Sequence, residues 1–168
     1  MLTLNNIGRN VMSKERNIFI SHYSKDEENI EKMKELLLSK NYKLKNSSID
    51  KTKRNEAKNE DYIEKILKDR ITWAKVFVCL IGPNTHKREW VDREIEEANK
   101  QGKRIVGVFI NGAQNSDIPA NLELFGDAVV GWTADKIIGA IEGEINNWEN
   151  TDGTIRTESK WSVARESC

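Results

Sequence analysis

The sequence predicts an α/β fold, namely a flavodoxin-like, doubly wound sheet of five parallel strands with helices on both faces. Short apolar runs typical of strands alternate along the chain with stretches whose apolar residues recur at helical spacing. The run Lys75–Ile81 is almost continuously apolar, which is typical of a strand that helices bury on both faces. Strands that alternate with helices in this way predict parallel pairing with right-handed crossovers.

The first half of the chain supplies two strands and two helices. Asn17–Ser21 is a short apolar strand, and Tyr42–Ile49 alternates more weakly, which predicts a less buried strand at an edge of the sheet. Apolar residues at helical spacing predict helices over Lys25–Ser39 and Tyr62–Ala74. Between the second strand and the second helix, the highly charged segment Asp50–Asn59 predicts a loop.

The second half continues the alternation after the central strand. Gly82–Thr85 ends the central strand. A third helix is predicted over His86–Lys100, with Gly102 just past its end. The remaining predicted elements are a buried strand Arg104–Ile110, a connecting segment Ala113–Phe125 with at most a short helix, a fifth strand Asp127–Trp132 and a last helix Ala134–Trp148. The domain is therefore expected to end with a helix.

The composition predicts one globular domain over residues 16–149, with an extension at 1–15 and a loose polar tail at 150–168. The 27 basic and 27 acidic residues cancel, so no net field favours binding to nucleic acid or to an anionic membrane. No apolar run approaches the roughly 20 residues that span a bilayer, and residues 1–16 lack the apolar stretch of a signal peptide. We therefore expect a cytoplasmic protein.

Neither metal binding nor a structural disulfide is expected. Cys79 lies within the central strand, where a cysteine packs as a small apolar residue, and Cys168 is the last residue. No spacing of Cys and His predicts a zinc site. The sequence also lacks G-x-G-x-x-G and G-x-x-x-x-G-K-[ST], which argues against a Rossmann dehydrogenase and a P-loop NTPase.

Ligands of such a sheet bind at the carboxyl ends of its strands. The polar residues that end or follow the predicted strands are Ser21, His22, Tyr23, Asp50 and Asn111. Three of them have an equally simple structural interpretation: His22 can cap the backbone that follows it, Tyr23 can pack over the end of the sheet, and Asn111 can form an Asn-Gly turn. This edge is therefore where a ligand is expected, whatever its chemistry.

Three charged residues near this edge are expected to have structural roles. Asp26 is expected to cap or start the first helix. His86 and Arg88 are expected to cap the third helix or to face solvent.

The third predicted helix places one acid against the domain. At about 100° per residue, Val91, Ile95 and Ala98 centre the buried stripe. Glu94 lies beside this stripe, on the flank that it shares with Trp90 four residues earlier. Periodicity alone favours a boundary residue that pairs with a lysine.

Three segments together resemble bacterial TIR and TIR-like domains. Residues 18–26, Ile-Phe-Ile-Ser-His-Tyr-Ser-Lys-Asp, resemble their first strand and box, and residues 90–95, Trp-Val-Asp-Arg-Glu-Ile, resemble their Trp-x-x-x-Glu helix motif. Residues 104–111 resemble the strand that follows. The resemblance runs from about Arg16 to Trp148, and it is strongest to the subgroup that includes the ThsB proteins of Thoeris anti-phage defence. The segment Asp50–Asn59 stands where TIR domains carry their BB loop, but it lacks a clear family signature.

The resemblance implies an enzyme that cleaves the nicotinamide–ribose bond of NAD+. The glutamate of the helix motif, here Glu94, is the catalytic residue of the family. The residues expected to contact the substrate are Ser21, His22, Tyr23, Asp50, Trp90 and Asn111. NAD+ would be a substrate, with no cofactor, and its product would be ADP-ribose or a cyclic isomer that a separate effector protein reads. Self-association on activation is possible. A non-catalytic interaction module and a nucleotide-binding sensor remain as alternatives.

Overall fold

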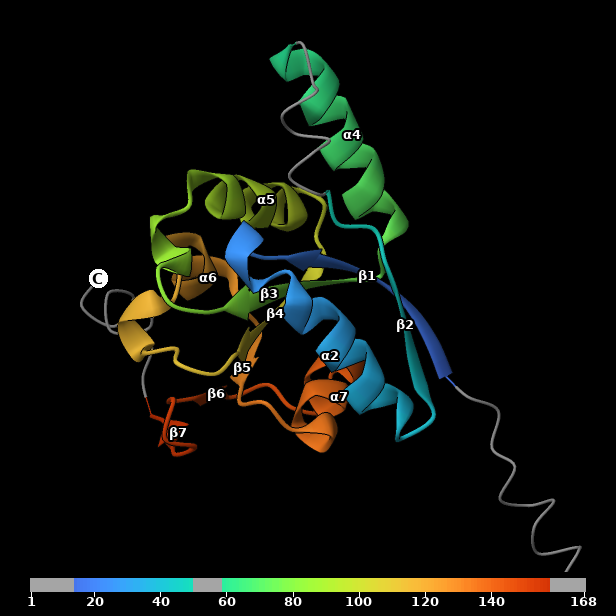
Figure 1. The fold of residues 1–168 in the computed structure, drawn as a ribbon. Helices are drawn as coiled ribbons and strands as arrows, with labels where there is room; N and C mark the ends of the chain where they lie inside the picture. The colour runs from blue at the N-terminus through green and yellow to red at the C-terminus, as the bar shows by residue number, and fades with distance from the viewer. Residues whose placement is uncertain (1–13, 50–58, 158–168) are drawn as a thin grey trace, which may run out of the picture.

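The structure, a computed structural model, describes residues 14–49 and 59–157 of the chain. Its sheet has the strand order β2-β1-β3-β4-β5-β6-β7 (Figure 1). The strands are β1 (Lys14–Ser21), β2 (Tyr42–Asn46), β3 (Val76–Ile81), β4 (Arg104–Phe109), β5 (Ala128–Val130), β6 (Trp148–Glu149) and β7 (Ile155–Arg156). The predicted parallel sheet of β1 to β5 is confirmed, and β2 lies at its edge as its weaker alternation indicated.

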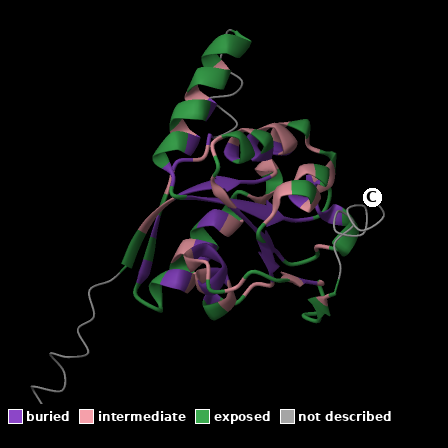
Figure 2. Cartoon of the chain, turned by 180° about the vertical axis from the view of Figure 1, so that it is seen from behind, coloured by how far each residue is buried: buried purple, intermediate pink, exposed green. Residues whose placement is uncertain are grey.

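Helices cover both faces of the sheet. They are α2 (Glu28–Leu38), α4 (Glu60–Trp73), α5 (Glu89–Lys100), α6 (Ala120–Phe125) and α7 (Ala134–Glu142), with short 3-10 turns η1 (Ser24–Asp26), η2 (Thr85–Lys87) and η3 (Asn115–Asp117). Figure 1 shows α2 and α7 together on one face and α4, α5 and α6 on the other. The first turns of α4 project beyond the body of the domain, and Figure 2 shows them largely exposed. The doubly wound arrangement is thus the predicted one.

The core consists of two apolar clusters, one on each side of the sheet. Alternate residues of the central strands point into opposite clusters, so Val78 packs with α2 and α7 while Phe77 packs with α4 and α5. Every residue of β3 is buried, which confirms the interpretation of its continuous apolar run. In Figure 2 the strands form the buried centre of the molecule. No helix in the described part of the chain is long and apolar enough to cross a membrane.

The end of the domain differs from its prediction. The last helix stops at Glu142 instead of Trp148, because Gly143 adopts the left-handed conformation, with φ of +84°, that terminates helices. Trp148 then begins β6, which pairs with β5 in parallel at Val129. Ile155, in the segment predicted as a loose tail, belongs to β7 and pairs with β6 in antiparallel orientation. The sheet therefore has two short strands that the sequence did not indicate.

The strand register determines where side chains emerge at the carboxyl edge. Ser21, the last residue of β1, lies opposite Cys79 of β3. β3 continues for two more residues and ends with Ile81 opposite Phe109 of β4. The strands therefore end at different heights along the carboxyl edge of the sheet. Residues that follow β1 leave the sheet earlier than residues that follow β4.

Candidate functional site

Ser21 and Glu94 form a buried hydrogen bond at the carboxyl edge. The Ser21 hydroxyl donates to Oε1 of Glu94 over 2.8 Å, although the residues lie 73 positions apart in the chain. Glu94 is 3% exposed and Ser21 is 1% exposed. A hydroxyl that donates to a buried carboxylate stabilises its ionised form, and such charge-assisted bonds are stronger than bonds between neutral groups. The hydrogen bond therefore holds the Glu94 carboxyl group in a fixed position inside the domain.

The amphipathic pattern of α5 explains the burial of Glu94. Val91, Ile95 and Ala98 fill the cluster beneath the helix, and Glu94 is buried beside them. The position predicted for Glu94, against the body of the domain, is thereby confirmed. Asp92 on the same helix is partly exposed, and its carboxylate accepts a bond from the backbone of α6. The acids of α5 therefore differ sharply in environment.

Asn46 holds the end of β1 from the neighbouring strand. Its Oδ1 accepts hydrogen bonds from the backbone N–H of Ile20 and of Ser48, each at 3.0 Å. Its Nδ2 donates to the Ser48 hydroxyl over 2.7 Å. The Asn46 side chain thus takes the place of a backbone hydrogen bond between β1 and β2 where β2 ends. It holds the backbone of Ile20, and with it the position of Ser21. This clamp was not predicted, since Asn46 looked like an ordinary residue of an edge strand.

His22 turns back onto its own strand. The residue is buried, and its Nδ1 lies 3.1 Å from the carbonyl oxygen of Ile20. Since a carbonyl only accepts, Nδ1 carries the proton in this contact. His22 therefore contacts the backbone that precedes it, not the following backbone that its structural interpretation named, and its predicted contact with substrate stays a prediction.

Tyr23 connects the end of β1 to the start of α5. The guanidinium carbon of Arg88 lies 3.9 Å from the centre of the Tyr23 ring. Arg88 is the residue that precedes the first turn of α5, and its side chain makes no capping hydrogen bond there. It is half-buried on an aromatic ring. Arg88 therefore occupies the expected N-cap position of α5, but its side chain neither makes a capping bond nor faces solvent freely.

Trp90 packs on the cluster beneath α5 and is partly buried. The Arg93 guanidinium carbon lies 5.4 Å from the centre of its ring, and Arg93 also pairs with Glu64 of α4 over 2.8 Å. Trp90 thus helps anchor α5 and lies one helical turn before Glu94. Its predicted role beside the substrate stays a prediction.

Cys79 is the thiol opposite Ser21 in the sheet. It is fully buried, and burial raises its pKa, with a further contribution from the nearby carboxylate of Glu94. The side chain therefore stays protonated and packs as an apolar residue, as the sequence indicated.

Asn111 lies in a different part of the edge. It is exposed and lines a cavity of about 430 Å³ at the carboxyl ends of β4 and β5. Ser21 and Glu94 do not line this cavity. Asn111 also occupies the predicted Asn-Gly turn, in which Ala113 N–H donates to the Ile110 carbonyl and Gly112 has a φ of +84°. Asp50 lies outside the described residues.

Two acidic residues, Asp117 and Asp26, lie near the end of β3. Asp117 accepts bonds from the backbone N–H of Asn84 and Gln114, and His86 Nδ1 lies 3.3 Å from its Oδ1. The Asp26 carboxyl group packs closely against Gly82. If Gly82 carried a Cβ, that atom would lie only 2.6 Å from Asp26 Oδ2. Burial raises the Asp26 pKa, and the charge of Asp117 raises it further.

Asp26 belongs to η1, which precedes α2, and its side chain is directed to β3 rather than to a helix cap. Within residues 14–49 and 59–157, no group of three or more His, Cys, Asp or Glu side chains could hold a metal ion.

Two contributors to the site were missed by sequence reasoning. Arg88 had a usable signal, because it sits between the break after β3 and the first residue of α5. Asn46 had none, because a side-chain bond to another strand depends on which strands are neighbours.

Comparisons with known proteins identify one matching family and several solved structures that resemble the chain. The chain matches Thoeris protein ThsB, TIR-like domain, over residues 19–115, which is more than half of its length. The TIR domains of the activated Roq1 resistosome, which directly recognises the pathogen effector XopQ, share 20% identity and a TM-score of 0.40; the match covers 57% of this chain and 58% of that one. The CMP N-glycosidase BcmB of Clostridium botulinum shares 17% identity and a TM-score of 0.42, covering 77% and 98%.

Among curated proteins, none matches the chain. The family match covers the end of β1 and all of α5 and β4, and with them the Ser21–Glu94 pair. The chain therefore belongs to the family of ThsB-type TIR-like domains.

Proposed function

We propose that the protein cleaves the nicotinamide–ribose bond of NAD+, with Glu94 as the catalytic residue. The observation that carries this proposal is the hydrogen bond from Ser21 to Glu94 in a domain of the TIR-like family. The bond aligns one carboxylate oxygen, and burial removes the water that would weaken its field. The known activity of a family does not transfer by fold alone, so the proposal rests on these two residues.

The chemistry needs only one carboxylate. A glycosidase commonly uses a second acid to protonate a poor leaving group. Nicotinamide is a cation when bound to ribose and departs as a neutral molecule, so no proton has to be supplied. Glu94 would hold the ribose hydroxyls and stabilise the positive charge that develops on the sugar. Ser21 would act as a positioning residue that fixes the carboxylate.

The nucleophile decides the product. If water attacks the ribose carbon, the products are ADP-ribose, nicotinamide and a proton. If a nitrogen of the adenine attacks the same carbon instead, nicotinamide again leaves, the new carbon–nitrogen bond closes a ring, and the product is a cyclic ADP-ribose. Exclusion of water from the site favours the second outcome.

Two residues are suited to the rest of the substrate. Arg88 carries a permanent positive charge and is held on the Tyr23 ring, so it would face the pyrophosphate. Trp90, one turn before Glu94, would stand beside the nicotinamide.

The closed geometry implies activation. A carboxylate that is 3% exposed cannot reach a dinucleotide until the side chains that cover it move. We infer that the resting protein turns over slowly and that self-association or an infection signal opens the site. The product would then act in the cytoplasm on a separate effector of anti-phage defence.

A single assay tests the proposal. The full chain is incubated with NAD+, alone, with a crowding agent and with lysate of phage-infected cells, and the products are separated by chromatography. Glu94→Gln is compared with Glu96→Gln, because Glu96 lies on the same helix but is exposed. Nicotinamide release that Glu94→Gln abolishes and Glu96→Gln retains supports the proposal. Intact NAD+ under every condition contradicts it, and NAD+ binding without cleavage favours a sensor.

A further inference from the structure

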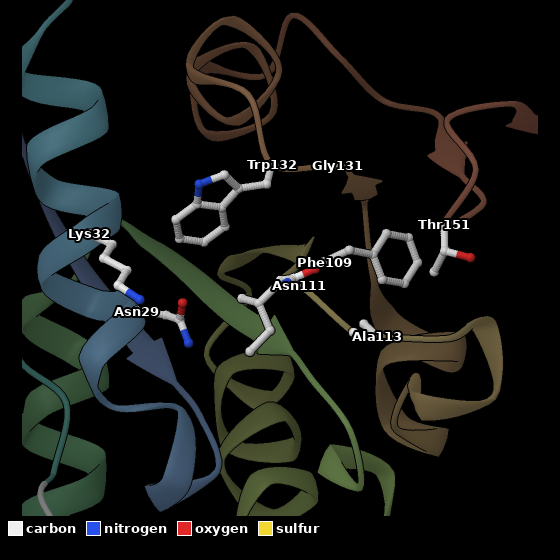
Figure 3. Close-up of a pocket in the computed structure, with 10 residues that line it drawn as sticks. Asn29, Lys32, Phe109, Asn111, Ala113, Gly131, Trp132 and Thr151 are labelled. Carbon is white, nitrogen blue, oxygen red and sulfur yellow. The ribbon is translucent and has the colours of Figure 1, made fainter.

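The cavity of about 430 Å³ at the carboxyl ends of β4 and β5 is distinct from the Ser21–Glu94 pair (Figure 3). It lies between α2, the turn after β4, the residues that follow β5, and Thr151 in the connection from β6 to β7. Ligand cavities commonly measure about 300–1,000 Å³. This volume is at the lower end of that range, which suits a mononucleotide better than an intact dinucleotide.

The cavity has one wall made for an aromatic group. Trp132 follows β5 and packs against the core cluster on the side of α2 and α7, while it also lines the cavity. Figure 3 shows its indole directed toward the cavity, and Phe109 and Ile110 also line the cavity. An indole that is held by the core offers a rigid face on which a nucleobase stacks, and such stacking contributes about 1–3 kcal/mol per base.

The opposite wall is polar and cationic. Asn29 and Lys32 reach into the cavity from α2, one turn apart, as Figure 3 shows. Asn111 and Thr151 contribute an amide and a hydroxyl from other segments. The ammonium group of Lys32 and the neighbouring amide of Asn29 are suited to a phosphate, while Thr151 lines the far side of the cavity.

The charge of the cavity favours an anion. Among the described residues that line it, Lys32 is charged and none is acidic. Glu149 lies beside Gly131 but is buried in an ion pair with Lys136, at 2.8 Å. Lys32 itself is 3.6 Å from the exposed carboxylate of Glu28, and exposed pairs of this kind contribute little. A phosphate can therefore replace Glu28 at a small energetic cost.

We propose that this cavity is a second, non-catalytic site that binds a nucleoside monophosphate, with the base on Trp132 and the phosphate at Lys32. The described residues that line the site include no carboxylate that could cleave a glycosidic bond, so its ligand is held and not converted. The site does not require that the protein cleave NAD+. Its location on the side of α2, away from the face that carries α5, leaves both sites free to be occupied together.

The test uses adenosine monophosphate and isothermal titration calorimetry on the full chain. Lys32→Ala is expected to weaken binding by about tenfold, as the loss of one charge-assisted contact does. Lys34→Ala is the matched control, because Lys34 lies on the same helix and does not line the cavity. Trp132→Leu is expected to weaken binding of both the nucleotide and adenosine. Inorganic phosphate alone should respond to Lys32→Ala and not to Trp132→Leu.

Glu94→Gln separates this proposal from the catalytic one. Nucleotide binding that Glu94→Gln leaves unchanged, while Lys32→Ala weakens it, supports the second site. The proposal is overturned if no binding is detected up to millimolar nucleotide. It is also overturned if Lys32→Ala and Trp132→Leu bind as the unaltered protein does, or if Glu94→Gln abolishes binding. A folded far-UV circular dichroism spectrum of each variant ensures that lost binding is not lost structure.

Discussion

The Ser21–Glu94 pair and the cavity at the ends of β4 and β5 share one edge of the sheet but have opposite properties. The pair is buried and holds a carboxylate. The cavity is open, has room for a small ligand and is lined by a lysine without any acid among its described residues. The comparison teaches that one edge of the sheet carries two different environments, a buried carboxylate that is held by a hydrogen bond and an open cavity that is lined by a lysine.

This separation follows from the side of the sheet that each region uses. Glu94 belongs to α5, whose apolar residues fill one core cluster, whereas Trp132 and Ile110 belong to the other. Gly82 stands between the regions: an added Cβ there would lie 2.6 Å from Asp26 Oδ2 and 2.7 Å from Ile110 Cδ1. Four substitutions can break or sharpen the distinction.

The largest effect is expected from Glu94→Gln. Removal of the only charge of the pair should lower the rate of NAD+ cleavage by about 10²–10³-fold, as loss of an electrostatic contact in the transition state does. The measurement is nicotinamide release by activated protein, with Glu96→Gln as the control. A variant that cleaves NAD+ within threefold of the unaltered protein would falsify the assignment of Glu94.

Ser21→Ala is expected to have the next largest effect. A hydrogen bond to a charged group contributes about 1.5–3 kcal/mol, so kcat/KM should fall by roughly tenfold or more. Ser21→Thr keeps the hydroxyl and should recover part of the activity, which separates positioning of Glu94 from simple packing. Equal activities of the alanine and threonine variants would show that the bond has no role in turnover.

Arg88→Met should raise the KM for NAD+ by about tenfold with a smaller change in kcat, because binding of the pyrophosphate loses one charge-assisted contact. Methionine keeps the length of the side chain. Lys87→Met is the matched control, since Lys87 is the exposed neighbour. If both variants raise KM equally, the effect is one of general charge and not of the Tyr23–Arg88 stack.

The smallest effect is expected from Asp26→Asn, at the border between the regions. The pKa of Asp26 is raised in the folded protein by burial and then by Asp117, so the unfolded chain ionises first as the pH rises. Stability associated with Asp26 is therefore full below pH 3.8 and is lost as the pH rises through the raised value.

Asparagine carries no charge, so Asp26→Asn removes the loss of stability that ionisation of Asp26 causes. The variant should be more stable than the unaltered protein at pH 7 by less than about 1 kcal/mol, since solvent screens a half-exposed group. Thermal unfolding at pH 3.5 and pH 7 measures the effect, with the exposed Asp135→Asn as control. A gain that is the same at both pH values would contradict the assigned cause.

Most of the fold could be predicted because it depends on local patterns. The continuous apolar run of β3 indicated a strand buried on both faces, and the spacing of Val91, Ile95 and Ala98 placed Glu94 against the domain. The last helix was extended too far because Gly143 was not recognised as its end. β6 and β7 were missed because strands of two residues leave no periodic signal.

The sequence by itself determined which residues could meet at the carboxyl edge, because strand ends and helix faces follow from apolar periodicity. Only the tertiary structure decided which of them do meet. It joined Ser21 to Glu94 and Tyr23 to Arg88, and it placed Asn111 apart from them, in the cavity at the ends of β4 and β5. The physical reason is that register and the choice of sheet face are set by the packing of the whole core.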